Sequence, residues 1–222
     1  MARMNDYQVA GEDNYVSGLT ELENDLLFIL IDASGSMEEH NSNVSEALRA
    51  ELVEKNKDID DACHMRAARA DFGEGYYLIN KFVEIKDFNT RYRARNEWTD
   101  LYGSIVKAAE FCKNTIEEKE GYTIRMQFVV FTDGAHNTGG YSLFDAANAV
   151  EELNSLGVLT TIVDFGYNNQ DVIDSLGFQV VRSCSNNKKE LFGFVKTMSS
   201  SFKSQSQKGE IDPSDWNFGN DE

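Results

Sequence analysis

Three oxygen-bearing side chains follow an apolar segment near the start of the chain. Residues 26–31 are all apolar, and Asp32, Ser34 and Ser36 come directly after them at alternate positions. One carboxylate and two hydroxyls within a single turn are hard oxygen donors, the ligands that Mg²⁺ prefers in proteins. The same residue types are also common in ordinary turns and at helix N-caps. On its own, this pattern is therefore open to either interpretation.

Two further segments offer ligands of the same kind. The apolar sequence "FVVF" is followed by Thr132, Asp133 and a glycine, and Asp133 supplies a second carboxylate. Thr99, in "EWTDLYGSI", supplies a hydroxyl where a loop leads into a predicted helix. Thr90 in "FNTRY" is a rival for this role, but no helix follows it. Two carboxylates roughly neutralise a divalent cation and hydroxyls add ligands without charge, so such a site can still accept an anionic ligand from outside.

The order of the predicted elements brings these segments to one edge of a sheet. Apolar patterning predicts strands over about residues 26–31, 63–71, 76–85, 124–133, 159–166 and 178–183. It predicts helices over about residues 43–55, 100–119, 144–156, 171–176 and 191–203. Strands that alternate with helices indicate a parallel sheet with helices on both faces, and ligands bind at the carboxyl ends of such strands. Asp32 and Asp133 are therefore expected to point into one crevice.

Local signals refine this α/β architecture. The glycines in "FGEG" predict a tight hairpin between the second and third strands, which makes one edge strand antiparallel. In the helix that stops at Gly157, the stripe expected to face the sheet consists of Phe144, Ala147, Val150 and Leu153. We therefore predict a mostly parallel six-stranded sheet with one antiparallel edge strand.

Composition limits the partners and the compartment. The chain has 222 residues, and we expect a polar lead-in over residues 1–24, one domain over 25–203 and an acidic flexible tail over 204–222. The formal net charge of −17 disfavours a nucleic acid or an anionic membrane as the partner. The polar N-terminal segment does not resemble a secretory signal. Three cysteines without CxxC spacing indicate buried thiols in a reducing compartment, so we expect a cytoplasmic location.

Together, the three oxygen-rich segments resemble the metal-ion-dependent adhesion site of the von Willebrand factor A domain family. In that family a first strand ends in D-x-S-x-S, a threonine precedes a helix as T-x-L-x-x-[AS]-[IL], and a later strand ends in T-D-G. This chain has Asp32, Ser34 and Ser36, then Thr99 in "TDLYGSI", then Asp133 in "FTDG". The match spans about residues 25–203, and all five positions are present.

The resemblance implies a Rossmann-like fold and a role for each of the five residues. Ser34, Ser36 and Thr99 would bind the ion through their hydroxyls, directly or through water. Asp32 and Asp133 would act mainly through water and by orienting the hydroxyls. The implied ion is Mg²⁺, with Mn²⁺ or Ca²⁺ as alternatives. The implied function is binding of an Asp or Glu side chain from a partner protein, and not catalysis.

Other features of the sequence bear on the partner. The chain has "EWT" where the family commonly has a glycine pair before the threonine, so Trp98 is expected to reshape the rim of the site. Arg91, Arg93 and Arg95 form the densest basic patch, either as a solvated loop or as a rim that attracts an acidic partner. His136 is a candidate to line the crevice. The last helix loosely resembles that of single-domain relatives that accompany bacterial tellurite-resistance and related stress operons and also occur in phages.

The alternative interpretation of the sequence is that the chain is an enzyme. A phosphohydrolase on a similar sheet would use Asp32 as a nucleophile, but position 34 is a serine where a second carboxylate is usual, and no suitably placed lysine follows a strand. A serine hydrolase would need G-x-S-x-G, which "SGSME" does not provide. The sequence "DFG" at Asp71 comes without the other kinase motifs, so we interpret it as the end of a strand. A metal site with a purely structural role stays open.

Overall fold

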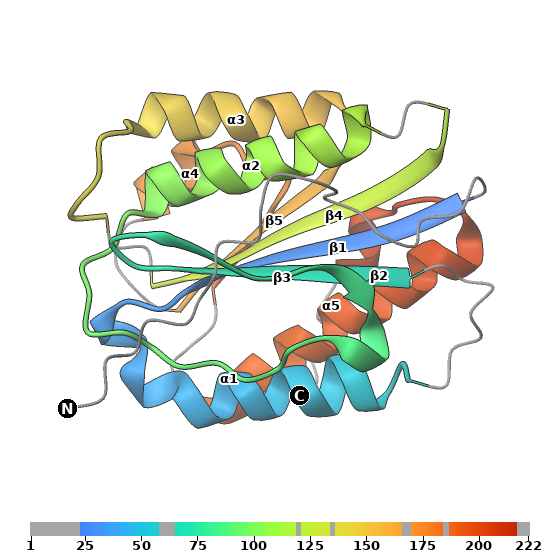
Figure 1. Cartoon of the computed structure of the whole chain (residues 1–222), viewed down its shortest axis with the longest axis horizontal. Helices are drawn as coiled ribbons and strands as arrows, with labels where there is room; N and C mark the ends of the chain where they lie inside the picture. Colours follow the sequence, from blue (N-terminus) through green and yellow to red (C-terminus); the bar gives the residue numbers. More distant parts are fainter. Residues whose placement is uncertain are drawn as a thin grey trace.

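Six strands form a single sheet in the computed structural model, which describes residues 23–57, 65–118, 121–133, 136–165, 170–183 and 187–216. The order across the sheet is β3-β2-β1-β4-β5-β6 (Figure 1). The strands are β1 Glu23–Asp32, β2 Met65–Phe72, β3 Tyr76–Glu84, β4 Thr123–Thr132, β5 Leu159–Asp164 and β6 Val180–Ser183. β3 pairs with β2 in antiparallel fashion and the other neighbouring strands pair in parallel, which confirms the predicted sheet.

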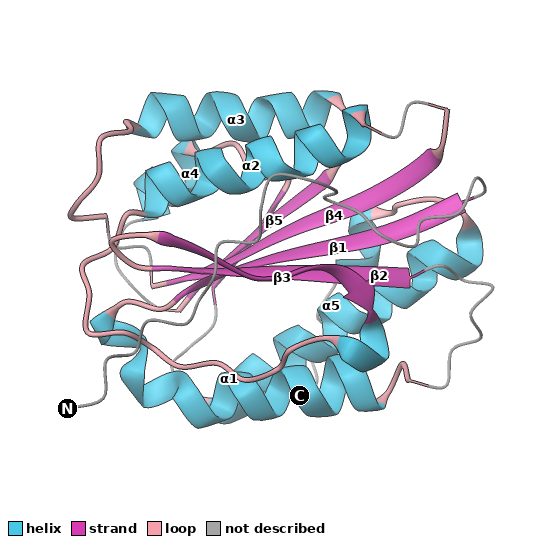
Figure 2. Ribbon diagram, viewed as in Figure 1, coloured by secondary structure: helices cyan, strands magenta, loops and turns pink. Residues whose placement is uncertain are grey.

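Helices cover both faces of this sheet (Figure 2). One layer consists of α2 Leu101–Glu117, α3 Leu143–Ser155 and α4 Gln170–Ser175. The other consists of α1 Asn41–Ala47 and α5 Lys188–Lys208, with η1 Gly35–His40 and η2 Leu48–Glu54 continuous with α1. Two short helices, η4 Ile85–Asp87 and η5 Pro213–Trp216, complete the described elements. In the described part of the chain, none of the helices has the length and apolar character that crossing a bilayer requires.

The central strand β1 is buried on both sides. Leu27, Ile29 and Ile31 belong to the apolar cluster on the α1–α5 side of the sheet. Their neighbours Leu26 and Phe28 belong to the cluster on the α2–α3 side. Because successive strand residues point to opposite faces, burial on both faces requires the uninterrupted apolar run that the sequence shows.

The position of β1 and β4 defines where a site can form. After β1 the chain moves outward to β2 and β3, and α2 then carries it back to β4 on the other side of β1. β1 is therefore paired with both β2 and β4, and strand order reverses between β1 and β4. In open α/β sheets the crevice at such a reversal is where ligands bind.

The buried stripe of α3 differs from the prediction. Ala146, Val150 and Leu153 are fully buried, whereas Phe144 is 72% exposed. Ala146, Val150 and Leu153 are spaced four and three residues apart and so share one side of the helix, and Phe144 lies two residues from Ala146 on the opposite side. The expectation that Phe144 faces the sheet is wrong.

The helices on the other face are longer than predicted. The first helical segment begins at Gly35 and not near residue 43, because the turn after β1 passes directly into η1 and α1. α5 continues to Lys208, five residues beyond Lys203, and ends at Gly209 in the left-handed conformation. The buried side chain of Gln205 donates hydrogen bonds to Asp25 Oδ1 (2.9 Å) and to the Arg125 carbonyl (3.0 Å), which fixes this last turn against β1 and β4.

Candidate metal centre

A pocket of about 240 Å³ lies where β1 and β4 end. Its lining comes from three separate segments and comprises Ser34, Gly35, Ser36, Glu97, Trp98, Thr99, Asp133 and Asn137. Four of the five residues predicted from the sequence are therefore in the lining. The fifth, Asp32, is the last residue of β1 and is completely buried. The fold thus brings together residues that are up to 101 positions apart in the sequence.

The two serine hydroxyls lie next to each other. Ser34 Oγ and Ser36 Oγ are 3.0 Å apart, and Ser36 is exposed while Ser34 is almost fully buried. Ser34 occupies the N-cap position of η1, yet its side chain makes no capping hydrogen bond. Helix capping by the side chain therefore does not explain why a serine stands at position 34. Each hydroxyl oxygen can still act as a ligand, because a hydroxyl accepts through two lone pairs and donates through one hydrogen.

Asp32 is held from both sides beneath the serines. Its Oδ1 accepts a hydrogen bond from the Ser34 amide (2.9 Å), and its Oδ2 accepts one from Thr132 Oγ1 (2.9 Å). Burial, and to a lesser extent the nearby carboxylate of Asp133, raise the pKa of Asp32 to about 7, against the opposing effect of the hydrogen bonds from Ser34 and Thr132. Two buried carboxylates with this mutual repulsion form a site where a cation is favourable.

Asn137 holds the backbone of Thr99. The Thr99 amide donates to Asn137 Oδ1 (2.7 Å), and the Thr99 carbonyl accepts from the amides of Asn137 (3.1 Å) and Thr138 (3.3 Å). These bonds tie the loop before α2 to the loop after β4. Thr99 is almost fully buried. Asn137 was not among the residues that the sequence analysis identified.

The start of α2 is fixed at the same point. Asp100 caps α2 by accepting from the Gly103 amide (3.0 Å), and its own amide donates to the Gly73 carbonyl (2.8 Å). Gly139 lies against the Asp100 carboxylate with φ of 112°, and a Cβ there would meet Asp100 Oδ1 at 2.1 Å. Only glycine fits this combination of a left-handed backbone and close approach.

A buried ion pair anchors the loop that leads to Thr99. Arg69 on β2 is completely buried and pairs with Asp71 through two bonds of 2.7 and 2.8 Å. Its Nη1 also donates to the carbonyls of Asn89 and Arg91, each at 2.9 Å. The guanidinium therefore satisfies a carboxylate and two loop carbonyls that the interior would otherwise leave unpaired.

The same loop also contacts the end of β1, next to the pocket. Buried Tyr92 donates its hydroxyl to the Asp32 carbonyl (2.6 Å), and its ring lies 5.6 Å from the Arg69 guanidinium carbon. The Arg95 amide donates to the Ala33 carbonyl (2.5 Å). The chain of contacts from Arg69 to Tyr92 to Asp32 thus fixes the loop relative to the end of β1.

The predicted partner-binding residues lie in different settings, and of these five residues only Trp98 lines the pocket. Trp98 is 64% exposed and lines the pocket, as its place beside Thr99 suggested. Arg95 stacks on the Tyr77 ring, with its guanidinium carbon 3.8 Å from the ring centroid, and the Tyr77 hydroxyl donates to Glu97 (3.1 Å). Arg91 and Arg93 are exposed on the loop.

His136 differs from its neighbour Asn137. Its ring stacks on Tyr102 with the centroids 3.7 Å apart, and it is absent from the pocket lining, which contains Asn137 instead. Burial lowers the pKa of His136, against an opposing effect of Asp100. His136 therefore packs on the start of α2, beside the crevice.

The donor set fits a hard divalent cation. Within the described ranges no group of three or more His, Cys, Asp and Glu residues is placed to hold a metal, so any site here must use hydroxyls as well as carboxylates. Hydroxyls and a few carboxylates that line a partly open pocket suit an ion such as Mg²⁺, which keeps coordination positions for water or an outside ligand. The residues present therefore fit the ion that the sequence indicated.

Comparisons with known proteins support the fold. No protein-family model matches the sequence, and no curated protein matches it. Among solved structures, the pilus adhesin SpaC from Lactobacillus rhamnosus GG superposes with a TM-score of 0.65 at 8% identity, over 81% of this chain and 30% of SpaC. The SpRpn10 VWA domain superposes with a TM-score of 0.53 at 14% identity, over 79% of this chain and 95% of that domain.

A third structure is of a protein whose own metal-ion-dependent adhesion site holds zinc. Proximal thread matrix protein 1 from the mussel byssus, with a zinc-occupied metal-ion-dependent adhesion site, has a TM-score of 0.55 at 16% identity, over 80% of this chain and 47% of that protein. The chain spans less than half the length of both this protein and SpaC. These likenesses establish that the chain has the von Willebrand factor A fold.

Proposed function

We propose that this chain is a metal-dependent protein-interaction module. Ser34, Ser36, Thr99, Asp32 and Asp133 hold a divalent cation, and an Asp or Glu side chain of a partner protein completes its coordination. The observation that carries this proposal is the convergence of three segments on one pocket, with paired serine hydroxyls above a buried carboxylate. The bound cation, Mg²⁺ by preference, supplies the positive charge that attracts the partner's carboxylate.

Each ligand has a distinct task in this proposal. Ser34, Ser36 and Thr99 present hydroxyl oxygens, so these three ligands add no negative charge that would repel an anionic partner. Asp32 and Asp133 supply negative charge, and their burial strengthens their attraction for a cation. Thr132 and the Ser34 amide hold both Asp32 oxygens in place.

The rim then contributes to partner choice. Trp98 offers an exposed apolar surface next to the pocket, and Arg91 and Arg93 offer positive charge that attracts an acidic partner. Changing both arginines to glutamate should slow association with a partner recovered in the experiment below and leave metal affinity unchanged. Arg49→Glu, also exposed but on η2, is the matched control. An unchanged association rate would remove the arginines from the proposal.

Two measurements test the module. Calorimetric titration should detect one Mg²⁺ or Mn²⁺ site in the wild type and none in Asp133→Ala, while circular dichroism shows that the variant remains folded. Partners captured from cytoplasmic host lysate should be lost with EDTA and with Asp133→Ala, and retained with Asp174→Ala at an exposed position on α4. Partners that remain bound in EDTA would contradict the proposal. Partners encoded in a stress or phage operon would extend it to that setting.

The geometry disfavours the phosphohydrolase alternative. A nucleophilic Asp32 would have to reach a phosphorus atom, but this side chain is completely buried and both of its oxygens accept hydrogen bonds. We therefore expect no turnover of p-nitrophenyl phosphate with Mg²⁺ present. Turnover that disappears in Asp32→Asn and persists in Asp174→Asn would favour the enzyme.

A further inference from the structure

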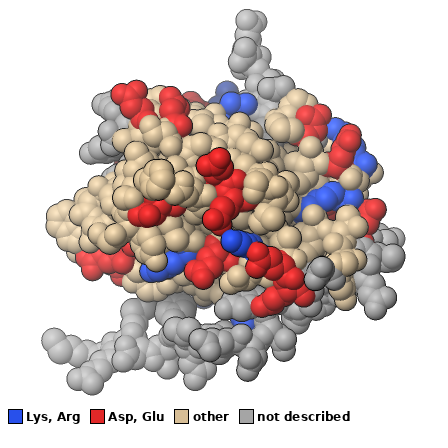
Figure 3. Space-filling view, turned by 90° about the horizontal axis from the view of Figure 1, so that it is seen from above, with Lys and Arg blue, Asp and Glu red and all other residues tan. Residues whose placement is uncertain are grey.

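The two helical layers of the sheet differ in charge. The helices α2, α3 and α4 together contain seven Asp and Glu residues and two Lys residues, a net charge of −5. The helices η1, α1, η2 and α5 contain six acidic and six basic residues, a net charge of zero. Figure 3, which views the molecule from above the α2–α3 layer, shows acidic side chains in several clusters and few basic ones. This face therefore favours a cationic partner.

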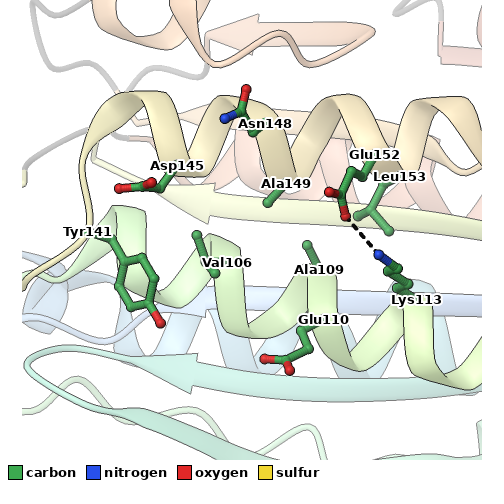
Figure 4. Close-up of a pocket in the computed structure, with 10 residues that line it drawn as sticks. All are labelled: Val106, Ala109, Glu110, Lys113, Tyr141, Asp145, Asn148, Ala149, Glu152 and Leu153. Atoms are coloured by element: carbon green, nitrogen blue, oxygen red, sulfur yellow. Dashed lines mark hydrogen bonds and ion pairs between the residues drawn. The ribbon is translucent and has the colours of Figure 1, made fainter.

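A groove of about 290 Å³ runs between α2 and α3 on this acidic face (Figure 4). Its apolar part is lined by Val106 and Ala109 of α2 and by Ala149 and Leu153 of α3. The small alanine side chains leave room above them, because they fill little of the space between the two helices. The groove can therefore accept an apolar side chain from outside.

The two ends of the groove are different. At one end Lys113 and Glu152 form an ion pair across the helices at 3.1 Å. At the other end lies Tyr141, which is 43% exposed, next to the first turn of α3. Phe144, in that turn, is 72% exposed but does not line the groove. An exposed aromatic side chain such as Tyr141 beside an apolar groove is typical of interaction surfaces.

Acidic groups stand on both sides of the groove. Glu110 is exposed on α2. Asp145 lies on α3, and its carboxylate accepts hydrogen bonds from the Ser142 amide (2.7 Å) and hydroxyl (2.6 Å), which hold its negative charge in position. Lys113 is already paired with Glu152, so the groove lining keeps an excess of negative charge.

We propose that the α2–α3 groove docks a basic segment of a partner protein, in which an apolar side chain is flanked by Lys or Arg. The apolar side chain would occupy the space above Ala109 and Ala149, and the cationic groups would face Glu110 and Asp145. A second copy of this chain is disfavoured as the occupant, because its net charge of −17 repels an acidic face and its other helical layer is neutral.

This surface is distinct from the metal pocket. The groove and the metal pocket share no lining residue. The proposal therefore goes beyond the metal-dependent function, and its partner segment has the opposite charge. Binding at the groove is expected to be unaffected by EDTA, which separates the two proposals experimentally.

The test uses the full chain and fluorescein-labelled synthetic peptides in 0.15 M salt with EDTA. A peptide with Lys and Leu at helical spacing should bind, and a Lys/Ser peptide of equal charge should bind at least roughly tenfold more weakly, a difference of 1.4 kcal/mol. Glu110→Lys should weaken the Lys/Leu peptide at least roughly tenfold. Glu117→Lys, the same charge change at an exposed position outside the groove on α2, should leave the affinity within about threefold.

A variant that fills the groove tests the apolar contact independently of charge. Ala149→Phe should abolish Lys/Leu peptide binding while the circular dichroism spectrum and the Mg²⁺ affinity stay unchanged. If that variant does not fold, NMR of the wild type replaces it, and the amide signals of Val106, Ala109 and Ala149 should shift when the peptide is added. Equal binding of both peptides, or equal loss in Glu110→Lys and Glu117→Lys, would overturn the proposal as diffuse charge attraction. Self-association abolished by Glu110→Lys, or binding that requires Mg²⁺, would also overturn it.

Discussion

Asn137 and Thr99 hold each other through both the backbone and a side chain. Asn137 Oδ1 accepts from the Thr99 amide at 2.7 Å, and the Asn137 amide donates to the Thr99 carbonyl at 3.1 Å. The hydroxyl of Thr99 therefore keeps its position only while the loop after β4 is in place. The proposed metal site would therefore depend on this link between two loops as well as on its ligands.

Asn137→Ala should weaken Mg²⁺ binding roughly tenfold, because groups that orient metal ligands commonly contribute at this level. The variant loses the side-chain acceptor for the Thr99 amide and keeps the backbone bonds. Calorimetric titration with Mg²⁺ measures the effect. Asn148→Ala, at an exposed position on α3, is the matched control. Equal affinities in both variants would show that Asn137 does not position Thr99.

Gly139→Ala should also weaken Mg²⁺ binding, because alanine at this position meets the Asp100 carboxylate and is strained at φ of 112°. The strain should amount to about 1–3 kcal/mol of stability and should displace the loop that carries Asn137. Gly140→Ala is the control, because a Cβ there has no heavy atom within 4 Å. Thermal unfolding and Mg²⁺ titration of the two variants provide the comparison, and equal behaviour would contradict the expectation.

Arg69→Met should reduce the free energy of unfolding by about 3–5 kcal/mol, because it leaves the Asp71 carboxylate buried without its cation. Urea denaturation measures this loss. Arg69→Met combined with Asp71→Leu should recover part of it, since an apolar pair leaves no uncompensated charge while the Asn89 and Arg91 carbonyls still lose their donor. Arg66→Met removes a partly exposed arginine from the same strand and should cost at most about 1 kcal/mol. A double variant no more stable than the single one would contradict this account.

The pKa of Asp32 predicts how pH affects the metal-free protein. Asp32 holds its proton to about pH 7 when the chain is folded and releases it near pH 3.8 when the chain is unfolded. Between these values the folded state binds more protons, so the free energy of unfolding falls as the pH rises from about 4 to about 7. The loss attributable to Asp32 should be about 2–4 kcal/mol between pH 4.5 and pH 7.

Chemical denaturation in EDTA at several pH values tests this expectation. Asp32→Asn stays neutral throughout, so its unfolding free energy should fall by less than that of the wild type over the same range. In the wild type, saturating Mg²⁺ should remove most of the fall in unfolding free energy between pH 4.5 and pH 7, since the cation favours the ionised carboxylate. The same pH dependence in the wild type and in Asp32→Asn would show that Asp32 does not titrate in this range.

Most of the fold follows from patterns that act over short distances. The uninterrupted apolar run of β1 indicates a strand covered on both faces, and the glycines of "FGEG" indicate the hairpin between β2 and β3. Each of these signals involves neighbouring residues whose environment is set by one element. Phe144 is where this reasoning fails, because two overlapping apolar stripes were available on α3 and packing against the sheet selected the one with Ala146.

The candidate site likewise contains residues that the sequence indicates and residues that it does not. The ligand candidates are recognisable because Asp32, Ser34 and Ser36 occupy the end of one strand in a characteristic spacing. Asn137 carries no comparable signal, since its role depends on how two loops meet in space. Arg69 and Asp71 do carry a signal in the sequence. Opposite charges two residues apart lie on one face of a strand, and in "AARAD" these two residues stand among small apolar residues.

A crystal grown with Mn²⁺ provides the most direct test, through an anomalous difference map recorded at the manganese absorption edge. The account predicts one strong peak in the pocket, about 2.0–2.3 Å from the hydroxyl oxygens of Ser34 and Ser36, with Thr99 and the two aspartates bound directly or through water. Absence of a peak there at saturating Mn²⁺, or a peak elsewhere on the chain, would contradict it.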